Sequence, residues 1–434
     1  ELIHALLKTE TDLLWFGGIG TYVKASNETH AEAGDRSSDA FRVNGRDLKA
    51  KVIGEGANLG LTQAGRIEFA QNGGRINTDA IDNSAGVDSS DHEVNIKILA
   101  AEAIRIKSLK AKDRNGLLAE MTDDVAAHVL RHNYDQTAAL SLAEASAAAD
   151  HEALERLMVY LEERGVLNRP LEGLPSSAQM RVRQEQGQFL TRPELAVLLA
   201  WSKIVLIDDV VASDIPDDPY FESVLTSYFT HPIDTYGEAI SNHRLKREII
   251  ATVIANRSLD MAGPVPLLRL REMSGGDSAA TVRGLEAARA VLDFDAFRRE
   301  VDSLDNTVPA DLQIDLRMQA MQAMNEAATW FVRMRPGMSV GDAVAESHVP
   351  LNELKAALAS VHSPYPASRI ERATRGFMKR GAPEALARWA AAMSNFAQGL
   401  VVTDLAKTAD IGVEEAASAF YALGDSLRLD RLRD

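Results

Sequence analysis

Short apolar runs that end in glycine or asparagine characterise the first hundred residues of the chain. They lie within residues 11–18 (TDLLWFGG), 50–58 (AKVIGEGAN) and 74–81 (GRINTDAI). Runs of this length that break into loop-forming residues are typical of buried strands in a parallel sheet. Ligands of open α/β sheets bind beyond the carboxyl ends of the strands. The pattern therefore predicts that the loops after these three runs face one crevice.

The spacing of apolar residues becomes helical from about Val94 onward, where they recur every three or four positions. Two helix ends are marked by their residues. Gly165 follows the run ALERLMVYLEER as a C-terminal glycine, and Thr191 precedes RPELAVLLAWSKI as an N-cap with Glu194 as its capping-box partner. Residues 236–257 have the pattern of one long amphipathic helix.

The two patterns together predict an α/β part followed by an all-α part. We place the first over residues 1–111 and a large all-helical domain over residues 112–434. The aromatic residues Trp15, Trp201 and Trp330 are interpreted as core residues. The histidines His92 and His243 are interpreted as surface or packing residues, because one histidine without a partner is weak evidence for a site.

Composition excludes several classes of protein. The chain has 434 residues, 46% of them hydrophobic and 25% charged, which suits a globular protein of two or three domains. Its net charge of −16 argues against nucleic-acid binding, which needs clustered lysine and arginine. No stretch reaches the roughly 20 apolar residues of a membrane span, so we expect no membrane partner.

The absence of cysteine excludes disulfides, thiolate metal ligands and a cysteine nucleophile. It fits a reducing compartment, and we expect a cytoplasmic protein. The chain opens with ELIHALLKTE, without methionine and inside a predicted helix. We therefore expect it to be a piece of a longer protein.

Residues 73–97 carry an unusual run of acids among small residues, which are Asp79, Asp82, Asp88, Asp91 and Glu93. A metal site is the least favoured interpretation, because the spacing matches neither a calcium loop nor an HExxH motif. A capping box with Ser90 as N-cap and Glu93 as its partner would start the helix that follows. A pocket is the third interpretation, since small residues and a serine hydroxyl at a helix start suit an anionic ligand. The last two are compatible.

Several segments resemble the large NAD-specific glutamate dehydrogenases of bacteria. They are LLWFGGIGTYVKA, GEGANLGLT, GGRINTDAIDNSAGVDSSDHEVNIKI, LTRPELAVLLAWSKI and HRLKREIIAT. The resemblance touches both parts of the chain and is most specific over residues 50–98. It implies the C-terminal part of such an enzyme, in which a partial Rossmann-like parallel sheet is followed by the helical C-terminal domain.

The resemblance also implies roles for single residues. Residues 55–62 (EGANLGLT) are similar to the family segment EGANGPTT, and residues 83–90 (NSAGVDSS) are similar to NAGGVTVS. By this comparison Asn58 and Asn83 lie near the nicotinamide of NAD, and Val87 and Ser90 line the pocket for the substrate carboxylate. Gly17 and Gly18 either approach the cofactor or form a tight turn, because GGIGTY lacks the G-x-G-x-x-G spacing.

The implied activity is oxidative deamination of L-glutamate to 2-oxoglutarate and ammonia, with hydride transfer to NAD⁺, by a homo-oligomer. The dinucleotide fingerprint and the catalytic lysine and aspartate of the family are expected upstream of Glu1. We therefore assign no catalytic residue and no metal ligand within the chain, and we expect the chain alone to be inactive. Two alternatives remain, a non-catalytic helical module for assembly or regulation, and a metal-dependent hydrolase that uses the acids between Asp79 and Glu93.

Overall fold

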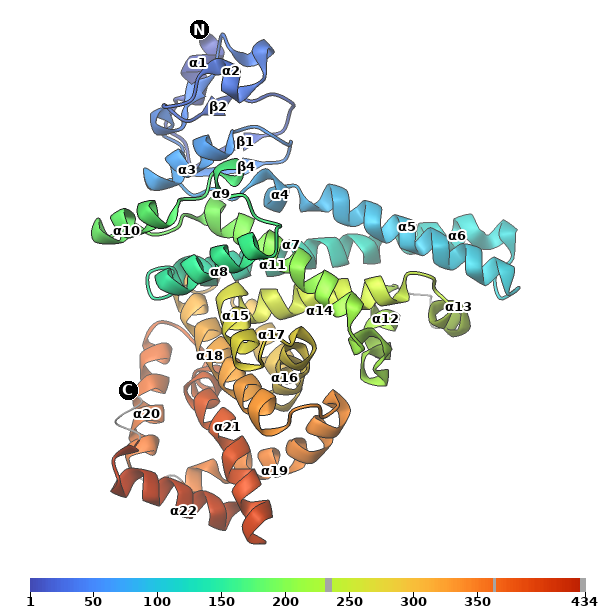
Figure 1. The fold of residues 1–434 in the computed structure, drawn as a ribbon, viewed down its shortest axis with the longest axis vertical. Coiled ribbons are helices and arrows are strands. Elements are labelled where there is room, and N and C mark those ends of the chain that lie inside the picture. Colours follow the sequence, from blue (N-terminus) through green and yellow to red (C-terminus); the bar gives the residue numbers. More distant parts are fainter. Residues whose placement is uncertain (231–235, 362–363, 430–434) are drawn as a thin grey trace. The chain divides into compact units, whose positions relative to one another are not determined.

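The computed structural model describes residues 1–230, 236–361 and 364–429, which are mostly helical (Figure 1). The chain divides into two compact units, Glu1–Val265 and Pro266–Asp434. No helix among the described residues is long and apolar enough to cross a membrane. The predicted boundary between residues 111 and 112 lies inside the first unit and stays a prediction.

Two pairs of short parallel strands open the first unit. The strands are β1 (Leu13–Phe16), β2 (Val23–Lys24), β3 (Val43–Asn44) and β4 (Val52–Glu55). Strand β1 pairs with β4, so that Leu13 lies opposite Val52 and Phe16 lies opposite Glu55, and β2 pairs with β3. The prediction of parallel strands within residues 11–18 and 50–58 is therefore confirmed.

The third predicted strand, within residues 74–81, is wrong. Arg75 forms only an isolated parallel bridge with Val52, and helix α4 (Asp79–Asp82) begins four residues later. Two hydrogen bonds hold this bridge, from Arg75 N to Lys51 O at 3.0 Å and from Ile53 N to Arg75 O at 2.9 Å. The chain then leaves the sheet at Asn77. Its side chain donates a hydrogen bond to Asp82 of α4 at 2.6 Å and accepts one from the distant Arg192 at 2.5 Å.

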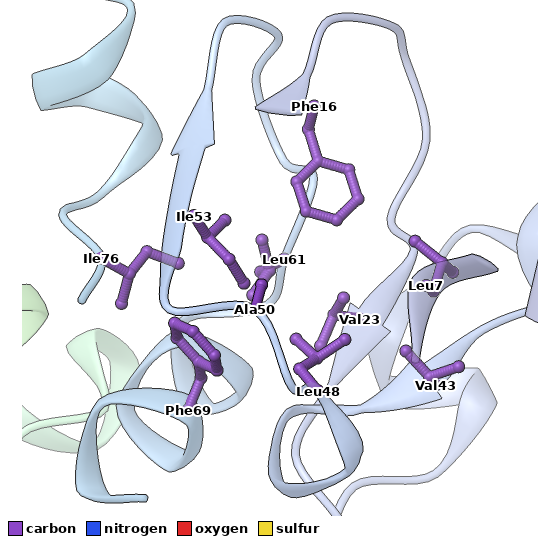
Figure 2. Packing of buried hydrophobic residues seen from close by; sticks show 10 residues of the cluster. All are labelled: Leu7, Phe16, Val23, Val43, Leu48, Ala50, Ile53, Leu61, Phe69 and Ile76. Atoms are coloured by element: carbon purple, nitrogen blue, oxygen red, sulfur yellow. The ribbon is translucent and has the colours of Figure 1, made fainter. Parts of the chain in front are cut away.

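A small apolar core fills the space between the strands and helix α3 (Gln63–Gln71), as Figure 2 shows. Its residues are Leu7, Phe16, Val23, Val43, Leu48, Ala50, Ile53, Leu61, Phe69 and Ile76. They come from both strand pairs, from the helices α1 (Leu2–Leu7) and α3, and from the loops between these elements. Because β1 and β4 pair in parallel, their carboxyl ends lie at the same edge of the sheet.

Trp15 does not belong to this core, so its predicted core role is wrong. The side chain is 57% exposed, and its ring lies against the backbone of Gly54 and Gly56 on the neighbouring strand. A Cβ atom at Gly56 would come within 2.4 Å of the indole, so the ring occupies the space that the glycines leave. Trp201 and Trp330 are half-buried.

Helices make up the rest of the first unit. They are α1 (Leu2–Leu7), α2 (His30–Ala33), α3, α4, α5 (Ser84–Arg105), α6 (Arg114–Glu120), α7 (Thr122–Ser146), α8 (His151–Glu163), α9 (Arg169–Glu172), α10 (Ser177–Glu185), α11 (Arg192–Ala212), α12 (Glu222–Tyr228), α13 (Gly237–Ser241) and α14 (Lys246–Ala262). Helix α7 packs against α5, α11 and α14, and α11 also packs against α3. Helix α11 thus links α3, beside the strands, to α7.

Two predicted helix ends are confirmed. The Glu194 carboxylate accepts hydrogen bonds from the backbone N and the hydroxyl of Thr191, both at 2.7 Å, at the start of α11. Helix α8 ends at Glu163, and Gly165 follows with a φ of 73°, the left-handed conformation that favours glycine. Both signals act within a few residues, and for this reason the sequence suffices to locate them.

The single long helix predicted over residues 236–257 is wrong. Helix α13 ends at Ser241 and α14 begins at Lys246, and the buried His243 lies between them. The ring of His243 accepts a hydrogen bond from Leu245 N at 3.2 Å through Nδ1, and its Nε2 lies 3.1 Å from the carbonyl oxygen of Asn95. A side chain that bonds to the backbone in this way competes with the helix, so the helix is interrupted at this residue. His243 is thus a packing residue.

The second unit is helical throughout its described residues. Its helices are α16 (Ser278–Val291), α17 (Phe294–Asp302), α18 (Ala310–Met334), α19 (Val340–Val361), α20 (Pro364–Lys379), α21 (Glu384–Ala409) and α22 (Val413–Ser426), and α15 (Pro264–Met273) spans the boundary between the units. Helix α18 packs between α16 and α21, and α19 contacts α16, α21 and α22. The fold is therefore a small parallel α/β part followed by helices.

Candidate functional site

The loop after β4 is held by a buried ion pair. Glu55, the last residue of β4, is fully buried, and Arg66 on α3 is 4% exposed. Arg66 donates from Nε to Glu55 Oε2 at 2.7 Å and from Nη2 to Oε1 at 2.9 Å. The same carboxylate accepts a hydrogen bond from Leu61 N at 3.1 Å. The two ends of the loop 55–61 are therefore tied to one another through a single carboxylate.

Two acids of the run at 79–93 complete this clamp. Asp79 accepts a hydrogen bond from Leu59 N at 2.8 Å and pairs with Arg66 at 3.2 Å. Asp82 accepts one from Glu55 N at 2.9 Å, and burial raises the pKa of its carboxyl group. These side chains fix the backbone of the loop and are not grouped as metal ligands.

Leu59 has a backbone conformation that its residue type disfavours. Its φ is 61°, in the left-handed region, where the compared family segment carries glycine. Such a conformation costs about 1–3 kcal/mol for a non-glycine residue and persists only where the surroundings enforce it. The hydrogen bond from Leu59 N to Asp79 supplies that constraint here. Leu59 thus replaces the glycine of EGANGPTT at the turn, while hydrogen bonds to Asp79 and Glu55 still hold the loop.

The structure brings together the two asparagines predicted from the sequence. Asn58 lies in the exposed part of the loop after β4, and Asn83 lies between α4 and α5. Asn83 Nδ2 donates a hydrogen bond to Asn58 Oδ1 at 3.1 Å. The remaining donor and acceptor groups of both amides are available to a ligand.

Gly17 and Gly18 lie beside this pair, directly after β1. Ala57 N donates a hydrogen bond to Phe16 O at 2.9 Å, so the chain after β1 runs next to the chain that leads into Asn58. Both glycines are exposed, and no atom lies within 4 Å of the place where Gly18 would carry a Cβ atom. The carboxyl ends of two parallel strands thus present glycine backbone and asparagine amides at one edge, where open α/β sheets bind ligands.

Val87 and Ser90 both lie on the exposed surface of α5. Val87 is 77% exposed, and the Ser90 hydroxyl donates a hydrogen bond to Gly86 O at 3.2 Å within the helix. The predicted capping box at Ser90 is wrong, because α5 begins at Ser84 and Ser90 lies in its second turn. Contacts with α7 extend the helix upstream, since Asn133 Nδ2 donates to Ser84 Oγ at 2.9 Å and to the backbone just before it.

Two further acids of the run, Asp88 and Glu93, have separate partners. Glu93 pairs with Lys97 one turn further along α5, and Asp88 accepts a hydrogen bond from His132 on α7 at 2.8 Å. These four acids therefore do not converge on one point, and among the described residues they do not form the all-carboxylate site that a metal-dependent hydrolase would need. Sequence reasoning missed both the Glu55–Arg66 clamp and His132, because their partners are 11 and 44 residues away with no local motif between them.

A separate cleft of about 300 Å³ lies in the first unit and is lined by Arg75, Glu144 and Arg192, among others. None of the site residues predicted from the sequence lines it. The guanidinium of Arg192 donates to Thr137 O at 2.9 Å and to Ser141 Oγ at 3.0 Å. Its cation is thus engaged within the fold, and the asparagine pair remains the better candidate site.

Comparison with known proteins agrees with these features. A family model described as bacterial NAD-glutamate dehydrogenase, catalytic domain, matches residues 1–143, and one described as glutamate dehydrogenase, C-terminal, matches residues 187–434. Three relatives named NAD-specific glutamate dehydrogenase align with this chain. The protein of Pseudomonas aeruginosa is 42% identical to it over 99% of the chain, and that of Halomonas elongata is 40% identical over 99%. The protein of Mycobacterium tuberculosis is 39% identical over 100% of the chain.

The chain spans 27% of the length of each of these relatives. The two family models cover the strand-containing segment with the asparagine pair and the helices that follow it, except those between residues 144 and 186. The second model alone extends over more than half of the chain. The chain therefore belongs to the glutamate dehydrogenase family.

Proposed function

We propose that this chain is part of an NAD-dependent glutamate dehydrogenase, which converts L-glutamate to 2-oxoglutarate and ammonia. The observation that carries the proposal is the hydrogen bond between Asn58 and Asn83 at the carboxyl ends of β1 and β4. The names of the relatives support the same activity and an NAD cofactor. On this proposal the β1–β4 pair belongs to a Rossmann-like sheet.

The residues at this edge suit the nicotinamide end of NAD. The amides of Asn58 and Asn83 would hydrogen-bond the carboxamide, and the backbone at Gly17 and Gly18 would allow a flat ring to approach closely. The cofactor accepts the hydride when it is bound. The task of this chain is to position the ring, and the Glu55 clamp holds the loop that carries Asn58 in a fixed conformation for this purpose.

Val87 and Ser90 would contact the side-chain carboxylate of glutamate. They lie three residues apart on α5 and therefore share one exposed face of the helix. The Ser90 hydroxyl can rotate away from Gly86 O and donate to a carboxylate oxygen, while Val87 would pack against the methylene groups of the substrate. The helix thus offers one polar and one apolar contact side by side.

Steady-state kinetics of Ser90→Asp in the complete enzyme test this assignment. The added negative charge would face the substrate carboxylate, so KM for glutamate should rise at least tenfold while KM for NAD⁺ changes little. Because Ser90 lies within α5 and does not cap it, Ser90→Ala should keep the wild-type melting temperature and serves as the folding control. A glutamate KM near the wild-type value in a folded Ser90→Asp enzyme would remove the substrate role.

The 434-residue chain by itself should not reduce NAD⁺ in the presence of glutamate. The reason is that the resemblance places the dinucleotide fingerprint and the catalytic lysine and aspartate outside this chain. Absorbance of NADH, measured with purified chain against a buffer blank, gives the answer. Turnover by the chain alone would show that its own residues carry the chemistry.

A further inference from the structure

Four side chains on helices α5 and α7 converge on one point. Asp88 and His92 are four residues apart on α5, and His128 and His132 are four residues apart on α7, so each pair projects from one face of its helix. The two helices pack side by side (Figure 1). The His92 ring centroid lies 5.7 Å from that of His128 and 5.8 Å from that of His132.

His92 is the unusual member of this group. It is 1% exposed, and neither of its ring nitrogens has a hydrogen-bond partner among the described residues. A buried donor or acceptor without a partner destabilises the fold, so native proteins rarely leave one without compensation. The ring packs at 4.5 Å on Tyr228, which fixes its plane, and Nε2 points toward Asp88 Oδ1 at 3.8 Å.

The nearby polar atoms are spaced as potential metal ligands. One atom each from Asp88, His92 and His132 lies within 4.8 Å of the other two. Imidazole nitrogen with carboxylate oxygen is a ligand set that Zn²⁺ and similar ions accept, at bond lengths of about 2.0–2.2 Å. Ligands of a tetrahedral ion at these lengths lie roughly 3.3 Å apart, so a modest contraction completes the site. The side chain of His132 is 47% exposed, so it has room to move and gives an ion access.

The electrostatics of the cluster suit a cation. Burial lowers the pKa of His92 to about 4, so its imidazole is neutral at pH 7 and retains a free lone pair. Burial opposes ionisation of Asp88, but the hydrogen bond from His132 holds the pKa of that carboxyl group below its usual value. The same hydrogen bond raises the pKa of His132, so an ion that binds there must displace a proton from this ring.

We infer that Asp88, His92 and His132 bind a divalent transition-metal ion of the zinc type that links α5 to α7. The site differs from the one considered on the acid run, because two of its three ligands are histidines and one comes from another helix. It lies roughly 150° around α5 from the face of Val87 and Ser90, by the turn of about 100° per residue. The ion would thus hold α5 against α7 on the side of α5 that faces away from Val87 and Ser90, without contact with substrate. The inference does not depend on the proposed function.

Titration of the metal-free 434-residue chain with Co²⁺ tests the site, since cobalt in a tetrahedral nitrogen and oxygen site absorbs visible light. We expect a saturable absorption at one ion per chain, with displacement by Zn²⁺. Asp88→Asn and His132→Ala should each weaken Co²⁺ binding by about a hundredfold or more, because losing a ligand exceeds the 10–100-fold cost of losing a supporting group. Both side chains are partly exposed, so these variants should fold.

His348→Ala is the matched control, because it removes one histidine of α19 in the other unit. It should keep the wild-type stoichiometry and affinity. The inference is overturned if the wild-type chain shows no saturable site at one ion per chain. It is also overturned if His132→Ala and Asp88→Asn bind Co²⁺ as tightly as the control, since the bound ion would then lie elsewhere.

Discussion

Replacement of Arg66 by methionine isolates the contribution of the buried clamp behind the asparagine loop. Arg66 is 4% exposed and Glu55 is fully buried, and two hydrogen bonds of 2.7 and 2.9 Å join them. Arg66→Met keeps most of the apolar stem but leaves the Glu55 carboxylate buried with only Leu61 N as a donor to it. Removing one partner of a buried ion pair costs about 3–5 kcal/mol, because the remaining charge stays desolvated.

The loss should depend on pH in a defined direction. Burial already raises the pKa of Glu55 in the wild type, and removal of Arg66 should raise it further. A carboxyl group whose pKa is raised in the folded state destabilises the protein at high pH. This penalty disappears as the pH falls from the folded pKa to the unfolded pKa. Arg66→Met should therefore be most destabilised near pH 8 and least near pH 4, relative to the double variant Glu55→Gln/Arg66→Met, which lacks the charge.

Hydrogen exchange followed by mass spectrometry measures the effect locally. Peptides that cover residues 52–62 contain Leu59 N and Leu61 N, which the clamp holds. A loss of about 3–5 kcal/mol corresponds to exchange that is faster by roughly a hundredfold to several thousandfold. The control is Arg105→Met, which removes a solvent-exposed pair with Glu102 on α5 and should leave these peptides unchanged.

Two results would refute this reasoning. One is an exchange rate in Arg66→Met that stays within a few-fold of the wild type at pH 8. The other is a double variant that is as unstable as the single one at that pH, because the penalty would then arise from lost packing and not from the uncompensated charge of Glu55.

Three further predictions follow from single features of the fold. In the metal-free chain, His92→Gln should lose less stability than the wild type on acidification. The reason is that His92 is largely neutral in both states at pH 7, and only the unfolded chain binds the proton between its usual pKa of 6.5 and the folded value of about 4. The wild-type loss at pH 5 is about 2 kcal/mol, measurable by urea unfolding at both pH values, and equal losses in the two proteins would contradict it. Gly284→Ala on α16 should destabilise the protein by about 1–3 kcal/mol, since the new Cβ would lie 2.8 Å from a valine methyl of α18. The control Gly116→Ala on α6 meets open space and should be neutral or stabilising. Thermal unfolding compares the two variants, and a Gly284→Ala variant as stable as the wild type would show that the two helices can separate at no cost. Residues 266–434 should fold alone with a helical spectrum and a cooperative melt, because their helices pack on one another, and a product without a transition would deny them independent stability.

Local sequence determined those elements whose signals lie within a few residues. The capping box of Thr191 and Glu194, the glycine after α8 and the two apolar runs of β1 and β4 were all predicted in place. The family resemblance likewise depends on short segments, and it names Asn58 and Asn83, which the structure joins by a hydrogen bond. Such signals succeed because caps, turns and strand alternation depend on neighbours along the chain.

Contacts between distant residues decided the rest. Helix α5 starts at Ser84, six residues before the predicted cap at Ser90, because α7 holds its first turns. The predicted helix at 236–257 is divided because the ring of His243 bonds to the backbone of α5 and to the backbone N of Leu245, two residues further along. The acids at 79–93 looked like one cluster in the sequence, yet they separate into a loop clamp, a surface pair and one side of a histidine group. Helix geometry and tertiary packing direct each of them to a different partner, and no property of the run itself encodes that choice.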